Sequence, residues 1–345
     1  MVSGSVTGAM TDPHRKTRKA GIAAVVGAAQ AMVLAAVTAA VSAESHLIET
    51  PVPVSAVSGA GGGAFVTLRD GTSYRLSPCR DKIVCLTRGP VTGILPEAPR
   101  GGLPDGRVAL ASDGDIRRAW YARPTTRYGH GVLGDKVEAG SLVAEDAAGR
   151  RYELVLPDTH VFEDITPRIA DLDGDGRNEI VAIRSSLKKG ASVAALGLRE
   201  GALTLLDTTR EIGRPNRWLN IAGIADYTGA GVPVIAWVET PHIGGTLKMA
   251  AFESGRLGTF ANTYRGFSNH VIGSRELDLA ATGDFTGDGV ADLALPDADR
   301  RSIVIAARTG FHKVRLSGRV SHSIVKVDGL VVTATADGRL IAIVP

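Results

Sequence analysis

Acidic side chains occupy every second position at the start of a nine-residue segment, Asp171-Leu-Asp-Gly-Asp-Gly-Arg-Asn-Glu179. Apolar runs typical of strands flank this segment, over residues 168–172 and 180–183. A loop of this kind can wrap around a hard divalent cation, with side-chain ligands at positions one, three, five and nine and a main-chain carbonyl near position seven. The pattern therefore predicts a cation-binding loop on a β-hairpin.

The loop recurs twice further along the chain. Asp284-Phe-Thr-Gly-Asp-Gly-Val-Ala-Asp292 repeats it closely, whereas Asp226-Tyr-Thr-Gly-Ala-Gly-Val-Pro-Val234 lacks carboxylates at positions five and nine. The first positions are separated by intervals of 55 and 58 residues, and each interval can hold four short strands with their turns. An EF-hand is excluded because position twelve is Ala182, within an apolar run, where that motif needs a glutamate. The spacing predicts one four-stranded unit for each loop.

With this spacing, the loops resemble the FG-GAP/VCBS repeats of integrin-type β-propellers and of many secreted bacterial proteins, over roughly residues 160–300. The resemblance implies two Ca²⁺ sites that stiffen hairpins, as they do in that family. The implied ligands are Asp171, Asp173, Asp175 and Glu179 with the carbonyl of Arg177 in one site, and Asp284, Thr286, Asp288 and Asp292 with the carbonyl of Val290 in the other. The middle loop at Asp226 is expected to bind no metal, although Gly229 and Gly231 can preserve its turn.

Runs of β-branched and apolar residues, separated by Asp-Gly, Glu-Gly, Ser-Gly or Thr-Gly turns, continue to the C-terminus. Glycine accounts for 42 of the 345 residues, which agrees with a turn-rich all-β protein. We predict a β-propeller of six or seven four-stranded blades. The last unit, residues 323–344, shows only three strands, so a strand from around Leu47 to Val57 is expected to supply the fourth and close the ring.

The N-terminus has the pattern of a signal peptide. Basic residues over 14–19 precede an uncharged, alanine-rich stretch over residues 20–40, and Val41-Ser-Ala43 offers small side chains for cleavage after Ala43. An uncleaved membrane anchor is the alternative, because about 20 apolar residues can span a bilayer. The remaining residues, 44–345, are predicted to form a single domain.

The charge of the chain gives no indication of a nucleic-acid partner. The formal net charge of +3 comes entirely from the predicted signal peptide, so residues 44–345 are formally neutral. A nucleic-acid-binding surface would show a clustered basic excess. We therefore expect no nucleic-acid partner, and no membrane contact after cleavage.

The two cysteines, Cys79 and Cys85, are close in sequence and follow the predicted cleavage site. In an exported chain such a pair favours a local disulfide. A thiol redox site is the alternative, but the four intervening residues do not match the C-x-x-C motif.

One segment concentrates residues that carry chemistry, Trp120 to Asp135, and within it Arg127, Tyr128 and His130 are candidate catalytic residues. Their residue types also fill blade junctions, so a structural role is favoured. Trp218 and Trp237 can likewise stack on carbohydrate, but their positions beside apolar runs favour packing in the core.

These observations favour an exported, calcium-binding β-propeller that acts, as a monomer, as a non-catalytic scaffold for a protein or glycan in the periplasm or outside the cell. The first alternative is a hydrolase or lyase that acts on polysaccharide in the propeller channel. The second is a membrane-tethered assembly protein that retains its apolar N-terminus.

Overall fold

The computed structural model describes residues 43–345, so the predicted signal peptide, residues 1–43, lies outside the described part except for its last residue. The described residues form β-strands and one short 3-10 helix, η1 (Ala60–Gly62). In this part of the chain, no helix is long and apolar enough to cross a membrane. The predicted all-β class is therefore confirmed.

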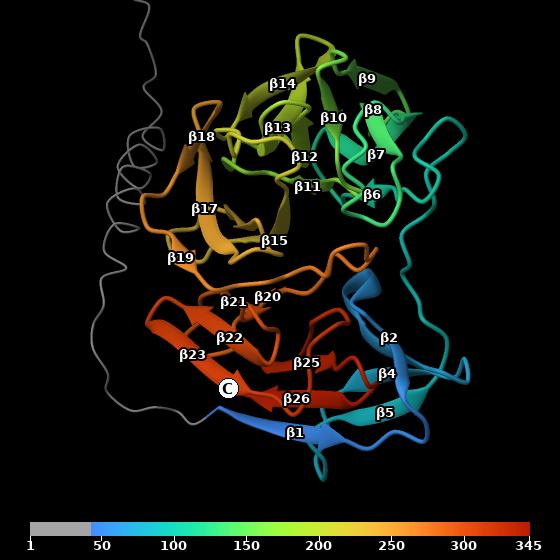
Figure 1. Ribbon diagram of the computed structural model, residues 1–345, viewed down its shortest axis with the longest axis vertical. Helices are drawn as coiled ribbons and strands as arrows, with labels where there is room; N and C mark the ends of the chain where they lie inside the picture. The colour runs from blue at the N-terminus through green and yellow to red at the C-terminus, as the bar shows by residue number, and fades with distance from the viewer. Residues whose placement is uncertain (1–42) are drawn as a thin grey trace, which may run out of the picture.

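The strands form antiparallel sheets that follow one another along the chain (Figure 1). The first contains β2 (Val54–Ser58), β3 (Ala64–Leu68), β4 (Ser73–Ser77) and β5 (Cys85–Arg88). A later sheet contains β15 (Leu219–Ala225), β16 (Val234–Glu239), β17 (Thr246–Glu253) and β18 (Arg256–Thr259), with β19 (Tyr264–Arg265) paired to β17. The next contains β20 (Ala281–Gly283), β21 (Asp292–Pro296), β22 (Ser302–Ala307) and β23 (Gly310–Arg315). In each of the three sheets the first four strands pair with their neighbours in sequence, because short turns connect antiparallel neighbours.

A nine-stranded sheet divides into two groups of strands. The first group contains β6 (Ala109–Leu110), β7 (Ile116–Thr125), β8 (Glu138–Asp146) and β9 (Arg151–Val155). The second contains β10 (His160–Phe162), β11 (Arg168–Ala170), β12 (Glu179–Ser186), β13 (Gly190–Arg199) and β14 (Ala202–Thr208). The pairing between the groups consists of one position, Phe162 of β10 opposite Ala139 of β8.

The first and last strands of the described chain share one sheet. β1 (Glu44–Ile48) pairs antiparallel with β26 (Leu340–Val344), and β25 (Leu330–Ala334) and β24 (Val325–Val327) complete the sheet. The three C-terminal strands thus take their fourth from the N-terminal segment, but the bounds Leu47 to Val57 were wrong. Pro51 and Pro53, which have no N–H to donate, follow β1, and the chain from Val54 onward belongs to the next sheet.

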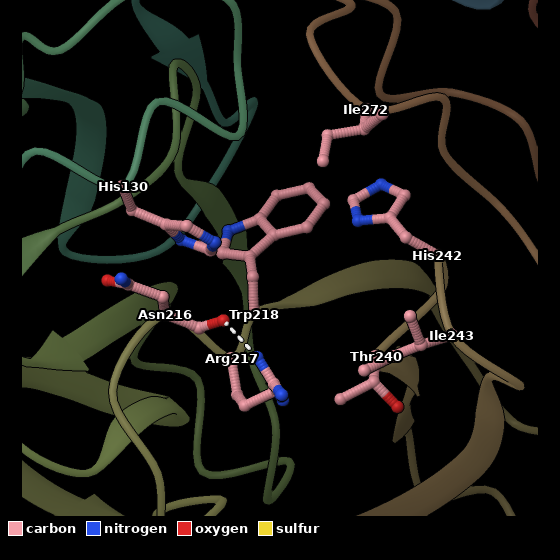
Figure 2. Close-up of a pocket in the computed structure, with 8 residues that line it drawn as sticks. All are labelled: His130, Asn216, Arg217, Trp218, Thr240, His242, Ile243 and Ile272. Carbon is pink, nitrogen blue, oxygen red and sulfur yellow. Dashed lines mark hydrogen bonds between the residues drawn. The ribbon is translucent and has the colours of Figure 1, made fainter.

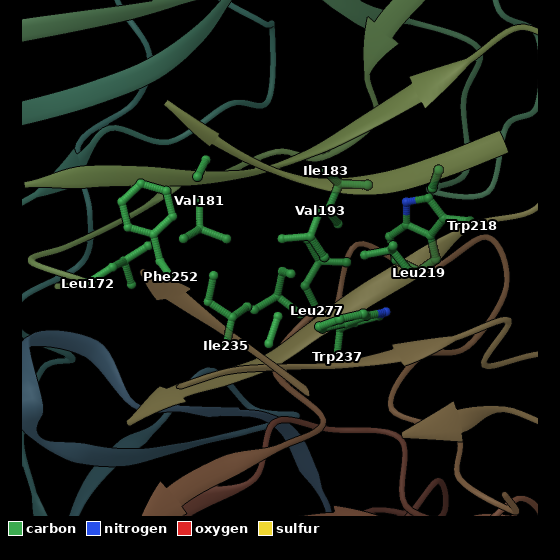
Figure 3. Packing of buried hydrophobic residues seen from close by; sticks show 14 of the residues in the cluster. Leu172, Val181, Ile183, Val193, Trp218, Leu219, Ile235, Trp237, Phe252 and Leu277 are labelled. Atoms are coloured by element: carbon green, nitrogen blue, oxygen red, sulfur yellow. The ribbon is translucent and has the colours of Figure 1, made fainter. Parts of the chain in front are cut away.

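Buried apolar side chains fill the space between successive sheets. In the cluster between β12–β13 and β15–β17, Trp218 and Trp237 pack with Ile183, Ile235 and Phe252 (Figure 3). Both tryptophans are 2% exposed. They are core residues, as predicted.

Further clusters join the other neighbouring sheets, with one exception. They lie between β7–β8 and β12–β14, between β15–β17 and β21–β22, between β21–β23 and β25–β26, and between β24–β26 and β2–β4. Among the clusters formed by residues 43–345, none joins β2–β5 to β6–β9. The chain crosses between those two groups through residues 89–108, on the right of Figure 1. We call this junction the seam.

Cys79 and Cys85 form a disulfide, with their Cα atoms 5.3 Å apart. The bond closes the connection between β4 and β5, and Cys85 pairs with Ser77 across these two strands. The predicted disulfide is therefore confirmed. Its presence is compatible with an exported protein.

Replacing both cysteines, by Cys79→Ser with Cys85→Ser, is expected to lower the free energy of unfolding by about 2 kcal/mol, because a short cross-linked loop restricts the unfolded chain modestly. Urea denaturation followed by circular dichroism measures this difference. The wild-type protein in reducing buffer is the control and should match the double variant. A double variant as stable as the oxidised wild type would show that the disulfide adds nothing to stability.

Candidate functional site

All three repeat loops fold around the side chain of their first residue. The carboxylate of Asp171 accepts hydrogen bonds from the backbone N–H groups of Gly174, at 2.7 Å, and Gly176, at 2.9 Å. The equivalent bonds run from Gly229 and Gly231 to Asp226, at 2.8 and 2.6 Å, and from Gly287 and Gly289 to Asp284, at 2.7 and 2.9 Å. The middle loop therefore keeps the shape of the other two, as its glycines predicted.

The two glycines of each loop adopt a left-handed backbone conformation. In the first loop φ is 71° at Gly174 and 84° at Gly176. The equivalent angles are 75° and 77° in the middle loop and 75° and 81° in the second loop. A side chain with a Cβ atom is strained in this region, whereas glycine is not. This conformational requirement explains why glycine recurs at positions four and six.

Three carboxylates converge in the first loop. One oxygen atom from each of Asp171, Asp173 and Glu179 lies within 4.8 Å of the others. Burial raises the pKa of Glu179 to about 7, although the Arg199 guanidinium donates to it at 3.1 Å. Burial and the neighbouring charges, Asp175 first, raise the pKa of Asp173. Carboxylates held together against repulsion form a donor set suited to a hard divalent cation.

Asp175 departs from the expected ligand arrangement. Its Oδ2 atom accepts hydrogen bonds from the Arg177 side chain, at 2.6 Å from Nη2 and 3.0 Å from Nε. Although burial opposes the effect, these bonds lower the pKa of Asp175. The predicted fifth-position ligand is therefore paired with a cation of the loop itself and lies outside the converging set.

The second loop contains a buried carboxylate oxygen without a partner. Asp292, at the start of β21, is fully buried, and its Oδ2 accepts from the N–H groups of Phe285 and Thr286, at 2.9 and 2.8 Å. Its Oδ1 has no hydrogen-bond partner within the described residues. Leaving such an oxygen unsatisfied is costly, and a cation in the loop would compensate it. At position five, Asp288 lies 3.3 Å from the Arg308 guanidinium.

The middle loop offers a poorer donor set. Ala230 stands at position five, and Val234 at position nine is fully buried in an apolar cluster. The Asp226 carboxylate accepts hydrogen bonds from the backbone and from the Thr228 hydroxyl, at 2.9 Å. Two of the four side-chain oxygen positions are thus missing.

A separate pocket of about 280 Å³ lies where four loops meet (Figure 2). These loops follow β7, precede β15, follow β16 and precede β20. The lining residues are His130, Asn216, Arg217, Trp218, Thr240, His242, Ile243 and Ile272. Four segments that are distant in sequence therefore converge on one small cavity.

His130 lines this pocket, and its imidazole ring is held by a buried carboxyl group. Its Nδ1 atom lies 2.6 Å from Oε1 of Glu163, which is fully buried and also bonded to the Ser185 hydroxyl at its other oxygen. The indole N–H of Trp218 donates to the Glu163 carbonyl at 2.9 Å. Burial raises the pKa of Glu163, and the bond to His130 opposes this rise. The arrangement fixes the imidazole ring and leaves its Nε2 atom for the pocket.

The three candidate catalytic residues do not share one site, because only His130 lines the pocket. Tyr128 is buried, and its hydroxyl accepts the N–H of Asn216 at 2.9 Å. The Nε atom of Arg127 donates to the carbonyl of His160 at 3.0 Å. Tyr128 and Arg127 thus have structural contacts that account for them.

Sequence reasoning missed three titratable residues beside the pocket. One is Glu163, and the others are His242 and His270, whose Nε2 and Nδ1 atoms lie 2.8 Å apart. Burial lowers the pKa of both histidines to about 4. Nothing in the local sequence connects them, because they come from loops that are far apart in the sequence.

No family model and no curated protein match this chain. The solved structures similar to it include the exotype rhamnogalacturonan lyase YesX, at 15% identity and a TM-score of 0.44, with 85% of this chain and 64% of that chain covered. A Bacillus licheniformis rhamnogalacturonan lyase has 14% identity and a TM-score of 0.43, with 85% and 66% covered. BamB from Moraxella catarrhalis has 14% identity and a TM-score of 0.35, with 83% and 70% covered. The chain spans just under two thirds of either lyase, and these similarities assign it no function.

Glu138, at the start of β8 and 2% exposed, predicts a pH dependence of stability. Burial, followed by the charges of Glu163 and Asp135, raises its pKa from 4.5 to about 9. The folded protein keeps a proton that the unfolded chain releases, so this group makes the free energy of unfolding fall as pH rises between those values. Glu138→Gln should flatten this slope and stabilise the protein at pH 9 by at least about 1 kcal/mol. Denaturant titrations across this pH range measure both quantities, and equal slopes in the two proteins would contradict the assignment.

Proposed function

We propose that this chain is an exported, calcium-binding β-propeller of six blades that acts as a non-catalytic binding scaffold. The six four-stranded units that support this count are β2–β5, β6–β9, β11–β14, β15–β18, β20–β23, and β24–β26 with β1. The division of the nine-stranded sheet rests on the single pairing between Phe162 and Ala139. In this proposal, the pairing of β1 with β26 closes the ring.

The convergence of Asp171, Asp173 and Glu179 is the observation that carries the metal assignment. The unpartnered Oδ1 of Asp292 supports a second site. Ca²⁺ suits both loops because it accepts six to eight oxygen ligands in a flexible geometry, including main-chain carbonyls. The first set would be completed by Asp175, which would exchange its Arg177 partner for the ion, and by the carbonyl of Arg177. The second set would be completed by Asp284, Thr286, Asp288 and the carbonyl of Val290.

Export is supported by the N-terminal sequence pattern and by the disulfide. We propose a periplasmic or extracellular monomer that binds a protein or a glycan and has no nucleic-acid partner. If the N-terminal segment were retained, the chain would instead be a membrane-tethered assembly protein. Sequencing the N-terminus of the exported protein distinguishes the two, because cleavage after Ala43 leaves Glu44 first.

Calcium is expected to stabilise the folded protein, because ions that bind only the folded state add to its stability. At a free concentration of about 100 times Kd, each site should contribute about 3 kcal/mol, and Mg²⁺ should contribute less. Asp173→Ala and Asp288→Ala should each remove the contribution of one loop. Thermal unfolding with Ca²⁺, with Mg²⁺ and with EGTA measures these effects.

Asp226→Ala is the matched control for these variants. It removes the first carboxylate of a loop with the same shape but an incomplete donor set. We expect it to lower the stability with EGTA and to leave the calcium-dependent rise in melting temperature intact. A melting temperature that does not respond to calcium in the wild type would refute the metal assignment.

A polysaccharide hydrolase or lyase is the second candidate, and the His130–Glu163 pair favours it. An imidazole held at Nδ1 by a buried carboxyl group can accept a proton at Nε2 from a bound substrate. If the protein turns over any member of a polysaccharide panel, His130→Ala should reduce kcat by at least about a hundredfold. Arg214→Ala, at an exposed position outside the pocket, is the control. Turnover that persists in His130→Ala would exclude this residue as the base, and unchanged binding without any turnover would favour the scaffold.

A further inference from the structure

Arg217 brings a positive charge without an acidic partner to the pocket of Figure 2. Its Nη1 atom donates to the carbonyl of Asn216 at 3.0 Å, and among the described residues it forms no ion pair with Asp or Glu. The guanidinium group carries five N–H donors, so most of them are available to a ligand. A guanidinium in this state binds a carboxylate through two parallel hydrogen bonds.

His242 presents a hydrogen-bond acceptor to the same pocket. The Nε2 atom of His270 lies 3.0 Å from the carbonyl oxygen of Ser274 and must carry a hydrogen to bond it. His270 Nδ1 is then a lone-pair acceptor, so the hydrogen in its bond with His242 belongs to His242 Nε2. The remaining nitrogen, His242 Nδ1, is therefore an acceptor, and it has no protein partner in the described chain.

In the tautomer that donates Nδ1–H to Glu163, His130 presents a second acceptor. Its Nδ1 atom is engaged with the buried Glu163 carboxyl group, and a proton at Nδ1 leaves a lone pair on Nε2. The Nε2 atom forms no hydrogen bond with residues 43–345. In Figure 2 the rings of His130 and His242 lie on opposite sides of Trp218. The two acceptors are thus separated across the pocket and suit two donor groups of one ligand.

The rest of the lining is apolar or conformationally strained. Ile243 and Ile272 are 61% and 66% exposed, which is high for large apolar side chains. Asn216 and Thr240 have φ angles of 52° and 53°. This region is unfavourable for a β-branched residue such as Thr240, and strained backbone tends to occur at ligand sites. Exposed apolar side chains and strained backbone are both features found at ligand-binding pockets.

We propose that this pocket binds a small hydroxycarboxylic acid. Its carboxylate would pair with Arg217, its hydroxyl groups would donate to His130 Nε2 and His242 Nδ1, and its carbon skeleton would lie against Ile243 and Ile272. A volume of about 280 Å³ admits a molecule of roughly one ring. The inference goes beyond the proposed scaffold role by adding a small-molecule ligand, and it does not depend on calcium.

Isothermal titration calorimetry of the purified protein tests this with four probes in two matched pairs. Glucuronate and glucose are both polyhydroxylated rings, and glucuronate carries the carboxylate. Mandelate and phenylacetate are both aromatic acids, and mandelate carries the hydroxyl group. We expect at least one of the two hydroxy acids to bind, and each one that binds to do so more tightly than its matched probe, which is glucose for glucuronate and phenylacetate for mandelate. The tighter of the two hydroxy acids identifies the carbon skeleton as a sugar or an aromatic ring.

Arg217→Gln should weaken the tighter hydroxy acid at least about tenfold, because a charge-assisted pair is lost. Arg214→Gln is the control: this arginine is exposed three residues away, does not line the pocket, and should leave affinity unchanged. The proposal is overturned if neither hydroxy acid binds, if the matched probe (glucose for glucuronate, phenylacetate for mandelate) binds as well as the hydroxy acid that binds more tightly, or if Arg217→Gln has no effect. Loss of the calcium response with intact acid binding would instead refute only the proposed metal sites.

Discussion

The antiparallel pairing of β1 with β26 is the interaction on which the arrangement of sheets depends most. Side chains that alternate along β26 enter two different apolar clusters: Leu340 and Ala342 face β2–β4, whereas Ile341 and Ile343 face β21–β23. By pairing with β26, β1 satisfies its backbone groups and holds it in register for both clusters. Two neighbouring junctions therefore rely on a strand that starts at the predicted cleavage site.

The seam between β2–β5 and β6–β9 contrasts with the other junctions. No apolar cluster of the described residues crosses it, so separating the two groups exposes little buried surface there. Local opening should therefore cost least at the seam. The loops of the pocket belong to other junctions, where Trp218 and Val132 lie in the cluster between β12–β13 and β15–β17. The pocket thus stands on a continuous core, away from the weakest junction.

Local patterns in the sequence predicted the features that depend on local chemistry. The repeat loops followed from the alternation of aspartate and glycine, and the disulfide from the separation of Cys79 and Cys85. The N-terminal strand that pairs with the C-terminal unit was placed too late, because Pro51 and Pro53 end β1 before the apolar run continues. The Glu163 and His270 contacts were not predictable, since each joins loops that are distant in sequence and neither lies in a motif. Burial raises the pKa of Glu163 and lowers that of His270, and the burial of both groups is established only when the sheets pack.

The first and middle repeat loops lie at the opposite ends of β12 and β16 from the pocket side. β12 begins at Glu179, in the first loop, and carries Ser185, which holds Glu163 behind His130. Six residues of extended strand separate Glu179 from Ser185, a distance of about 20 Å. β16 repeats this arrangement, because Val234 ends the middle loop and Thr240, just beyond the strand, lines the pocket. An ion in the first loop is therefore too remote to touch a pocket ligand, and its influence on the pocket must pass through the stability and register of β12.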